Sequence, residues 1–309
     1  MVTRRTITFP SKLLKEITLP CFDAVGSRDG PLLTLLAGVH GCEYSPIAAV
    51  REFMNGLDTS GLAGRVVAVP VVNLAAFRAR TPFVTPEDGK NLNRCFPGDP
   101  NGTFSEVLAH HLFQQLILPS DYLIDLHAGD MVEELEPFAL YDESEVEGVA
   151  KGMANAYGVR YVIRQAAANK TVAGSTSAAA AGAGIPAVIA EAGGRGLLER
   201  SSVQTHLGGL GNVLRHLGMV EEGPPPVSLE TPRHLGDFLW LRSRTRGWWE
   251  SKVKVGEEVS EGTLLGTLSD LFGRELEWIV APKRGVTLFI TSSPSVDVDG
   301  LLLGLGTDQ

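Results

Sequence analysis

Long apolar runs alternate with amphipathic stretches along the first two thirds of the chain. Four of these runs are continuously apolar, as is typical of strands buried on both faces of a sheet. They span residues 32–39, 65–72, 121–127 and 186–193. Five stretches with helical patterning lie between and after them, at residues 45–56, 103–118, 143–157, 174–184 and 199–217. This alternation predicts an α/β fold with a mainly parallel, mixed sheet and helices on both faces.

The pattern changes after residue 220. The stretch EEGPPPVS at residues 221–228 contains three consecutive prolines, which cannot continue a helix and are typical of a stiff, extended linker. Short segments rich in Val, Leu and Trp follow between glycines, with a weak internal repeat between residues 253–268 and 292–306. We therefore expect a large domain over residues 1–222 and a small all-β domain over residues 229–309.

Composition narrows the class of protein. The 309 residues carry a formal net charge of −9 without any basic run, which argues against nucleic acid as a partner. The apolar runs are too short to cross a bilayer, and the N-terminus lacks the apolar segment of a signal peptide. The three cysteines, Cys21, Cys42 and Cys95, show no close pairing and suit a reducing compartment. We expect a cytoplasmic protein that binds a small molecule and no membrane, and the sequence leaves a homo-oligomer open.

Polar side chains gather where the predicted strands end. His40 and Glu43 follow the first strand directly, and His127 ends the third. Ligands of open α/β sheets bind at this edge, and two imidazoles with one carboxylate suit a catalytic zinc ion that keeps water in its fourth position. A His-x-x-Glu pair alone is common by chance, and a lone histidine after a strand is more often a hydrogen-bonded core residue. Because all three lie at strand ends, we predict one Zn²⁺ per chain on His40, Glu43 and His127.

Glu191, in the fourth apolar run, has three interpretations. It is a fourth metal ligand, a carboxylate that takes and relays the proton of metal-bound water, or an N-cap for the next helix. Gly193 and Gly194 follow it, and we expect them to leave room for a substrate.

Arginines in and before the loop at residues 88–98 are candidates for substrate contacts. Asn93 and Arg94 lie in this loop, where the planar fork of an arginine matches a carboxylate and the amide adds a hydrogen bond. The alternative for Arg94 is an ordinary surface arginine. Upstream, Arg78 or Arg80 could polarise a scissile carbonyl and stabilise its oxyanion. Spacing does not separate these two, and we favour Arg80.

Four motifs in order, GVHGCEY, NLNRCFPG, DLHAG and AEAGG, resemble the succinylglutamate desuccinylase/aspartoacylase family. The likeness covers almost the whole chain, and it is closer to the bacterial "predicted deacylase" branch, which includes N-acetyl-diaminobutyrate deacetylases of ectoine breakdown. Members of this family are zinc-dependent amide hydrolases with a carboxypeptidase-like α/β core. The resemblance therefore implies that fold and that chemistry for this chain.

The resemblance also implies roles for the matching residues at the strand ends. It implies a zinc ion on His40, Glu43 and His127. It implies Glu191 as the general base that activates water and then protonates the departing amine.

The substrate contacts implied by the resemblance come from the loop and its approach. Asn93 and Arg94 would bind the carboxylate of the amino-acid part. An arginine upstream of the loop would act on the scissile carbonyl, with Arg80 as the catalytic candidate and Arg78 as a further substrate-binding one.

Two positions depart from the pattern of the family. Asn91 stands where many relatives have an aspartate that orients a metal-bound histidine. Asn91 can accept the same hydrogen bond without the charge, and Asp88 or Asp125 could take over the role. Cys42 lies inside the metal motif where an amide is more usual, and we do not expect it to be a ligand.

The C-terminal domain resembles the barrel of biotinyl and lipoyl domains through WIVAPKRGV at residues 278–286. The modified lysine of such domains lies at a hairpin tip, and the corresponding residues 270–277 contain no lysine. We therefore expect no swinging arm. The domain is interpreted as a lid or an oligomer contact beside the zinc cleft, or as a part that only completes the fold.

These observations lead to one functional expectation and two alternatives. We expect a zinc-dependent deacylase that hydrolyses the amide bond of a small N-acylated amino acid, of the N-acetyl or N-succinyl type. A metallocarboxypeptidase for short peptides would use the same ligands, but a C-terminal domain that blocks the cleft favours small substrates. A non-catalytic small-molecule sensor on the same scaffold is the second alternative, and the complete set of expected residues argues against it.

Overall fold

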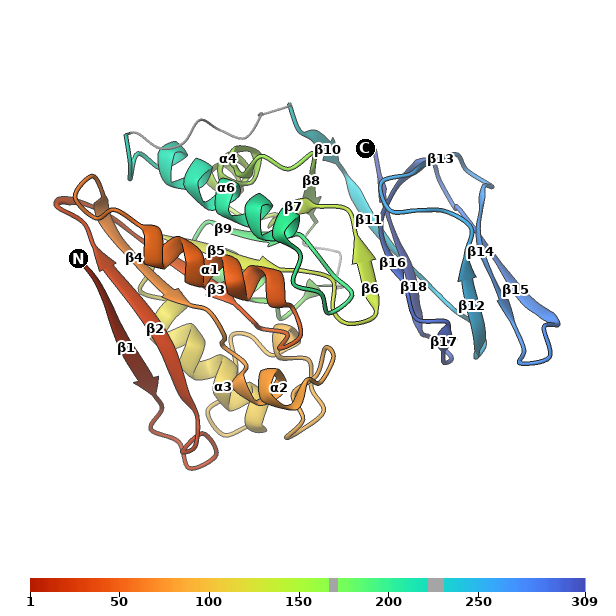
Figure 1. Cartoon of the computed structure of the whole chain (residues 1–309), viewed down its shortest axis with the longest axis horizontal. Coiled ribbons are helices and arrows are strands. Elements are labelled where there is room, and N and C mark those ends of the chain that lie inside the picture. Colours follow the sequence, from red (N-terminus) through yellow and green to blue (C-terminus); the bar gives the residue numbers. More distant parts are fainter. Residues whose placement is uncertain (167–171, 222–230, 309) are drawn as a thin grey trace.

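A long mixed sheet forms the larger part of the molecule (Figure 1). The structure is a computed structural model that describes residues 1–166, 172–221 and 231–308. Within these residues the sheet has nine strands, in the spatial order β1, β2, β4, β3, β5, β9, β7, β8, β10. Their bounds are β1 Val2–Thr8, β2 Thr18–Val25, β3 Arg28–Ala37, β4 Ala63–Val69, β5 Tyr122–His127, β7 Phe138–Asp142, β8 Tyr161–Gln165, β9 Ala187–Glu191 and β10 Arg233–Leu235. The four strands predicted from apolar runs are β3, β4, β5 and β9, which form a parallel centre.

Helices cover both faces of this sheet, as predicted (Figure 1). Within the described residues the α-helices are α1 Tyr44–Gly56, α2 Leu74–Ala79, α3 Phe104–Leu112, α4 Glu147–Tyr157, α5 Thr176–Gly182 and α6 Arg200–His216. α1, α4 and α6 pack on one face, in the core that contains Met54, Met153 and Leu210. α3 and α5 pack on the other face, in the core that contains Leu108 and Ala180. None of these helices combines the length and the apolar character needed to cross a membrane.

The outer strands make the sheet more mixed than its centre. β1 and β2 form an antiparallel hairpin, and β2 runs antiparallel to β4. On the other side, β7 runs antiparallel to β9 and parallel to β8. The predicted α/β fold is therefore confirmed, and the antiparallel edges were not expected from the apolar runs.

Beyond residue 236 the chain forms two further sheets. One contains β11 Asp237–Arg242, β18 Leu301–Thr307, β16 Gly285–Thr291 and β13 Glu258–Val259, and the other contains β15 Glu275–Val280, β14 Leu264–Ser269, β12 Gly247–Ser251 and β17 Ser295–Val296. Side chains such as Trp249, Leu265 and Leu302 form a core of their own. This part is all-β, as expected, and its likeness to a biotinyl or lipoyl barrel stays a prediction.

Two strands connect this all-β part with the large sheet. β6 (Glu133–Leu135) follows β5 and pairs with β16, so that Glu133 lies opposite Thr291. β10, which follows the predicted linker, still belongs to the large sheet because it pairs with β8. Residues 222–228 of the linker lie outside the described residues, and the domain division at residues 222 and 229 stays a prediction.

Candidate functional site

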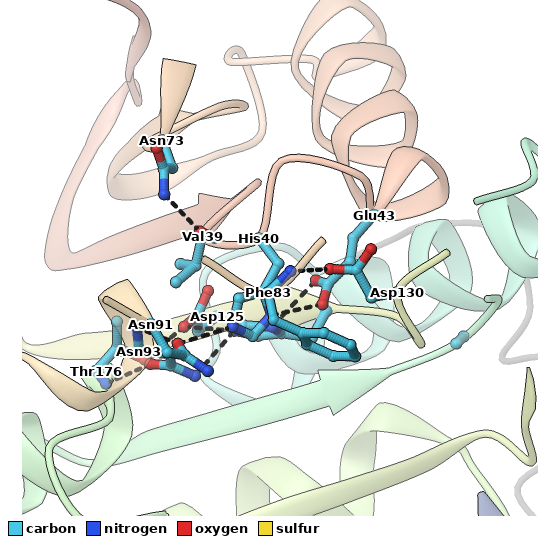
Figure 2. A network of polar contacts seen from close by, with 12 residues as sticks. Val39, His40, Glu43, Asn73, Phe83, Asn91, Asn93, Asp125, Asp130 and Thr176 are labelled. Carbon is cyan, nitrogen blue, oxygen red and sulfur yellow. Dashed lines mark hydrogen bonds and ion pairs between the residues drawn. The ribbon is translucent and has the colours of Figure 1, made fainter. Parts of the chain in front are cut away.

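The candidate site lies at the carboxyl edge of the parallel strands. β3 pairs with β5 and β5 pairs with β9, and this register places His127 directly opposite Glu191. The chain leaves β3 at Ala37 and enters α1 at Tyr44, and the intervening turn carries His40 and Glu43. Figure 2 shows the side chains of this turn directed toward the strand ends.

The three predicted metal ligands meet at this edge. His40 Nδ1 lies 2.7 Å from Glu43 Oε1, and His127 Nδ1 lies 3.1 Å from Glu43 Oε2. One ligand atom from each residue lies within 4.8 Å of the other two, so this group could hold a metal ion. Among the residues that the structure describes, no other group of this kind is found, and neither Glu191 nor the buried Cys42 belongs to it.

A close backbone approach explains the glycine inside the His-x-x-Glu motif. A Cβ atom on Gly41 would lie 2.1 Å from the backbone nitrogen of Phe77 in α2. α2 is held here because Asn73, its N-cap, accepts a hydrogen bond from the backbone of Ala76 and donates one to the carbonyl of Val39. The motif therefore delivers two ligands from one turn only because α2 packs against a residue without a side chain.

We expect Gly41→Ala to destabilise the protein by about 1–3 kcal/mol, the usual cost of overpacking, and to weaken metal binding by shifting the turn. Gly56→Ala is the matched control, because a Cβ at this helix end meets nothing within 4 Å. The control should be neutral or gain up to about 1 kcal/mol. Thermal unfolding and a chelator competition with Zn²⁺ measure both variants. An unchanged melting temperature for Gly41→Ala would contradict the packing argument.

Each histidine is held through its second ring nitrogen. His40 Nε2 lies 3.0 Å from Asn91 Oδ1, and His127 Nε2 lies 2.9 Å from Asp125 Oδ2. Asp125 Oδ2 also accepts a hydrogen bond from the hydroxyl of Thr176 (Figure 2). Such partners fix the orientation of a ligating ring. Asn91 thus keeps its contact with His40 without a charge, and Asp125 orients His127.

Asp88, the other acid considered for this role, lies elsewhere. Its carboxylate accepts hydrogen bonds from the backbone and the hydroxyl of Ser105, at 2.8 Å each, at the start of α3. Glu106 accepts a hydrogen bond from the backbone of Thr103 at the same helix end, as in a capping box.

The electrostatics of the three ligands favour a cation between them. Burial by itself would raise the pKa of Glu43, but the nearby imidazoles of His127 and His40 lower it to about 2. Burial opposes charge on His127 as well, and yet Asp125 and Glu43 raise its pKa well above the usual value. Glu43 Oε2 is buried without a hydrogen bond, although it faces His127 Nδ1. A divalent cation would satisfy this oxygen and replace the protons that the histidines otherwise carry.

Glu191 ends β9 beside this group. Its pKa is raised to about 7, chiefly by burial, because a charged carboxylate is costly where water is largely absent. The charge of His127 opposes this rise, and the charge of Glu43 adds to it. The N-cap interpretation of Glu191 is wrong, since α6 begins at Arg200 with Glu199 as its N-cap.

The two glycines after Glu191 do not leave room for a substrate, contrary to expectation. A Cβ on Gly194 would lie 2.3 Å from the carbonyl oxygen of Glu133, and one on Gly193 would meet the side chains of Ser202 and Ser45. These glycines instead let neighbouring segments pack closely against the end of β9.

A cavity of about 1400 Å³ opens beside the three ligands and Glu191. Asn93 and Arg94 line it, as do Trp240 and Arg242 from the C-terminal sheets. The side-chain oxygen of Asn93 is occupied by the backbone N–H of Thr176 at 3.0 Å. The guanidinium of Arg94 lies 6.0 Å from the ring centre of Trp240, and burial together with the charge of Arg242 lowers its pKa.

The upstream arginines lie apart from this cavity. Arg78 and Arg80 are exposed at the end of α2, and neither lines it. Phe83 lines it instead, with its ring centre 6.0 Å from that of His40. The backbone N–H of Phe83 donates a hydrogen bond to Asp130 at 2.6 Å (Figure 2). The roles predicted for Arg78 and Arg80 stay predictions.

Sequence reasoning missed three residues of this site: Phe83, Asp130 and Glu133. The only local signal for Phe83 is the proline before it, because its positive φ of 56° is not visible in the sequence. Asp130 directly follows the DLHAG motif and Glu133 lies three residues further on, so their closeness to His127 in the sequence was a signal that they lie near the site.

Comparison with known proteins decides the family. Residues 29–217 match the model of the succinylglutamate desuccinylase/aspartoacylase catalytic domain. The chain belongs to this family. It is 32% identical over 253 residues to the N-alpha-acetyl-L-2,4-diaminobutyric acid deacetylase of Halomonas elongata. The aligned region covers 79% of this chain and 72% of the relative.

Solved structures share the architecture of the whole chain. The product-bound ectoine utilization protein EutE (DoeB) of Ruegeria pomeroyi matches with a TM-score of 0.86 and 25% identity, over 99% of this chain and 95% of that chain. A family member from Rhodobacter sphaeroides matches with a TM-score of 0.86 and 24% identity, over 100% and 96% of the two chains. Both cover the C-terminal sheets, so these sheets are part of the fold that the chain shares with them. Membership in this family of amidohydrolases makes the chain a hydrolase.

Proposed function

We propose that the chain is a zinc-dependent deacylase that hydrolyses the amide bond of a small N-acylated amino acid. The observation that carries the proposal is the meeting of His40, Glu43 and His127 beside Glu191 in one cavity. The substrate in the name of the Halomonas relative is itself an N-acylated amino acid, which supports this substrate class.

The donor set fits zinc. Two imidazole nitrogens and one carboxylate are the ligands of many catalytic zinc sites, and they leave a position open. His40, Glu43 and His127 would hold the ion. When bound, zinc lowers the pKa of water and polarises a carbonyl oxygen.

Glu191 would move the proton of the reaction. Its carboxylate would accept a proton from the attacking water and deliver it to the departing nitrogen. Burial raises the pKa of Glu191 to about 7, so the group can both take up and release a proton near neutral pH. Arg94 would bind the substrate carboxylate, since its guanidinium lines the cavity and has no carboxylate partner among the described residues. Asn93 holds the loop through its oxygen and could donate its amide N–H to the substrate.

An arginine near the metal turn would stabilise the oxyanion. We retain Arg80 for this role and Arg78 as a second substrate-binding candidate. Arg80 follows α2, the helix that packs against Gly41 of the metal turn, although Arg80 does not line the cavity.

The C-terminal sheets favour a small substrate over a peptide. Trp240 and Arg242 on β11 line the cavity and so take up space that a carboxypeptidase would need for the rest of its peptide. This observation ranks a deacylase above a metallocarboxypeptidase, and the presence of Glu191 beside the ligands ranks it above a sensor without catalysis.

A substrate panel with metal analysis tests the proposal. The purified protein should contain about one zinc ion per chain and should hydrolyse N-acetyl or N-succinyl amino acids with a kcat/KM at least 100-fold above that for dipeptides. Faster cleavage of dipeptides would establish the carboxypeptidase instead. Ligand binding without hydrolysis of any panel member at full zinc occupancy would establish a sensor.

A further inference from the structure

His206 is a buried histidine behind the end of β9 that the proposed hydrolysis does not use. It lies on α6, which packs beside α4 on one face of the large sheet (Figure 1). Its side chain is fully buried, and the buried face of α6 also contains Val203 and Leu210. A buried imidazole costs free energy that an apolar side chain of similar size would not, unless its polar atoms find partners.

Both ring nitrogens of His206 have partners. Nε2 lies 3.2 Å from the carbonyl oxygen of Ala192, and Nδ1 lies 2.7 Å from the hydroxyl oxygen of Tyr157 at the end of α4. A carbonyl oxygen only accepts, so Nε2 carries the hydrogen, and burial lowers the pKa of the ring to about 4, which keeps it neutral. Nδ1 therefore accepts from Tyr157, whose ring packs directly on α6 at Gly209, where a Cβ would lie 2.4 Å from it. These contacts give the imidazole one tautomer and one orientation.

The carbonyl that His206 binds belongs to the residue after Glu191. Glu191 is the last paired residue of β9, opposite His127 of β5. The N–H of Ala192 donates to the carbonyl of His127 at 3.1 Å, and the carbonyl of Ala192 accepts from His206. Gly193 follows with a φ of 96°, so the chain turns away from the strand directly after these bonds. The two bonds of Ala192 therefore fix the end of β9, and with it the position of Glu191.

His206 and the cavity lie on opposite faces of this strand, because side chains alternate between the faces. Val188 and Ala190 belong to the core beneath α6. Ile189 and Glu191 face the other way and line the cavity, which His206 does not line. His206 thus supports the end of the strand from behind, away from the place of a substrate.

We infer that His206 is a positioning residue for Glu191. Its hydrogen bond to the carbonyl of Ala192 holds the end of β9 so that the Glu191 carboxylate lies beside the metal ligands. This inference rests on the proposed deacylase function, in which Glu191 moves a proton, and it adds a residue that acts through Glu191. The position matters because misplacing a reacting group by about 1 Å can reduce a rate by about 100-fold.

Replacement of His206 by leucine and by glutamine tests the inference. His206→Leu leaves the carbonyl of Ala192 without its donor, so kcat should fall by about 100-fold, while KM and zinc content stay within about 2-fold of the wild type. His206→Gln can donate to the same carbonyl and accept from Tyr157, so its kcat should stay within about 10-fold of the wild type. A kcat of His206→Leu close to that of the wild type, or no recovery with glutamine, would overturn the inference.

Two further variants separate positioning from stability. Asn212→Leu removes a buried amide of the same helix, whose Nδ2 lies 3.5 Å from the carbonyl of Tyr157 and does not reach β9. It should lower the melting temperature and keep kcat. Tyr157→Phe combined with His206→Leu removes the hydroxyl that His206→Leu alone leaves unpaired, so the melting temperature should recover while kcat stays low. A kcat that falls equally in Asn212→Leu, or that recovers with the melting temperature in the double variant, would show a structural role alone.

Crystal structures of the zinc-loaded wild type, His206→Leu and Asn212→Leu separate this inference from the proposed function. The Glu191 carboxylate should be displaced relative to His127 by about 1 Å or more in His206→Leu, and it should keep its place in Asn212→Leu. An undisplaced Glu191 in His206→Leu would overturn the inference and leave the deacylase function intact. If the wild type hydrolyses no N-acylated amino acid, the deacylase proposal fails, and the position of Glu191 in these structures still decides the role of His206.

Discussion

His127→Ala should abolish zinc binding and hydrolysis together. The substitution removes one of three ligands, and it also leaves two buried carboxylates without their shared partner, because His127 lies 3.1 Å from Glu43 and 2.9 Å from Asp125. We expect less than about 0.1 zinc per chain after dialysis and a loss of kcat/KM of at least 1000-fold, since catalytic metal chemistry needs the complete site. Breaking a buried ion pair typically costs about 3–5 kcal/mol, so the melting temperature should fall as well.

Two further variants allow the metal site to be tested even if His127→Ala folds poorly. His40→Ala removes a ligand whose second nitrogen contacts only the neutral Asn91, so it should lose zinc with a smaller loss of stability. His234→Ala, at an exposed position on β10, should keep zinc, activity and stability. Full zinc occupancy in both His127→Ala and His40→Ala, measured by atomic emission on folded protein, would contradict the metal site.

The strands that position the site were predictable because their signal is local. The central parts of β3, β5 and β9 are buried, so each appears in the sequence as a mainly apolar run with a polar residue at its end or shortly after it. β1 shows the opposite case. Most of its residues are exposed at the sheet edge, and without an apolar run only its pairing with β2 makes it a strand. Edge strands of this kind are defined by their neighbours rather than by their own composition.

Only those site residues that lie at the ends of the parallel strands could be predicted from the sequence. His40, Glu43, His127 and Glu191 follow from the parallel register, because the carboxyl ends of adjacent strands meet at one edge. Glu133 does not follow from it, since its position depends on a strand pairing with β16, more than 150 residues later.

The loop after α2 sets a second limit to sequence reasoning. The sequence offered Arg78 or Arg80 for the scissile carbonyl, and spacing did not separate them. The path of this loop brings Phe83 to the cavity and leaves Arg80 exposed at the end of α2. A loop path depends on contacts such as that between Phe83 and Asp130, which no local pattern reports.

Glu191→Gln should separate catalysis from metal binding. The amide is nearly isosteric with the carboxylate but cannot accept the proton of the attacking water, and general acid–base catalysis is typically worth about 100- to 10,000-fold. We therefore expect kcat to fall by about 1000-fold while zinc content stays near that of the wild type, because Glu191 is not part of the ligand group. A variant that loses its zinc would show instead that Glu191 is a ligand.

The pH profile distinguishes proton transfer by Glu191 from a structural role. Only the ionised carboxylate accepts a proton, so kcat/KM of the wild type should rise with pH as Glu191 deprotonates and then level off. Burial raises the pKa of Glu191 to about 7, whereas a bound cation lowers it, so the rise should occur below pH 7 in the zinc-loaded enzyme. The residual activity of Glu191→Gln should lack this rise. A rise that persists in the variant with the same midpoint would assign the titration to another group and remove Glu191 from the proton transfer.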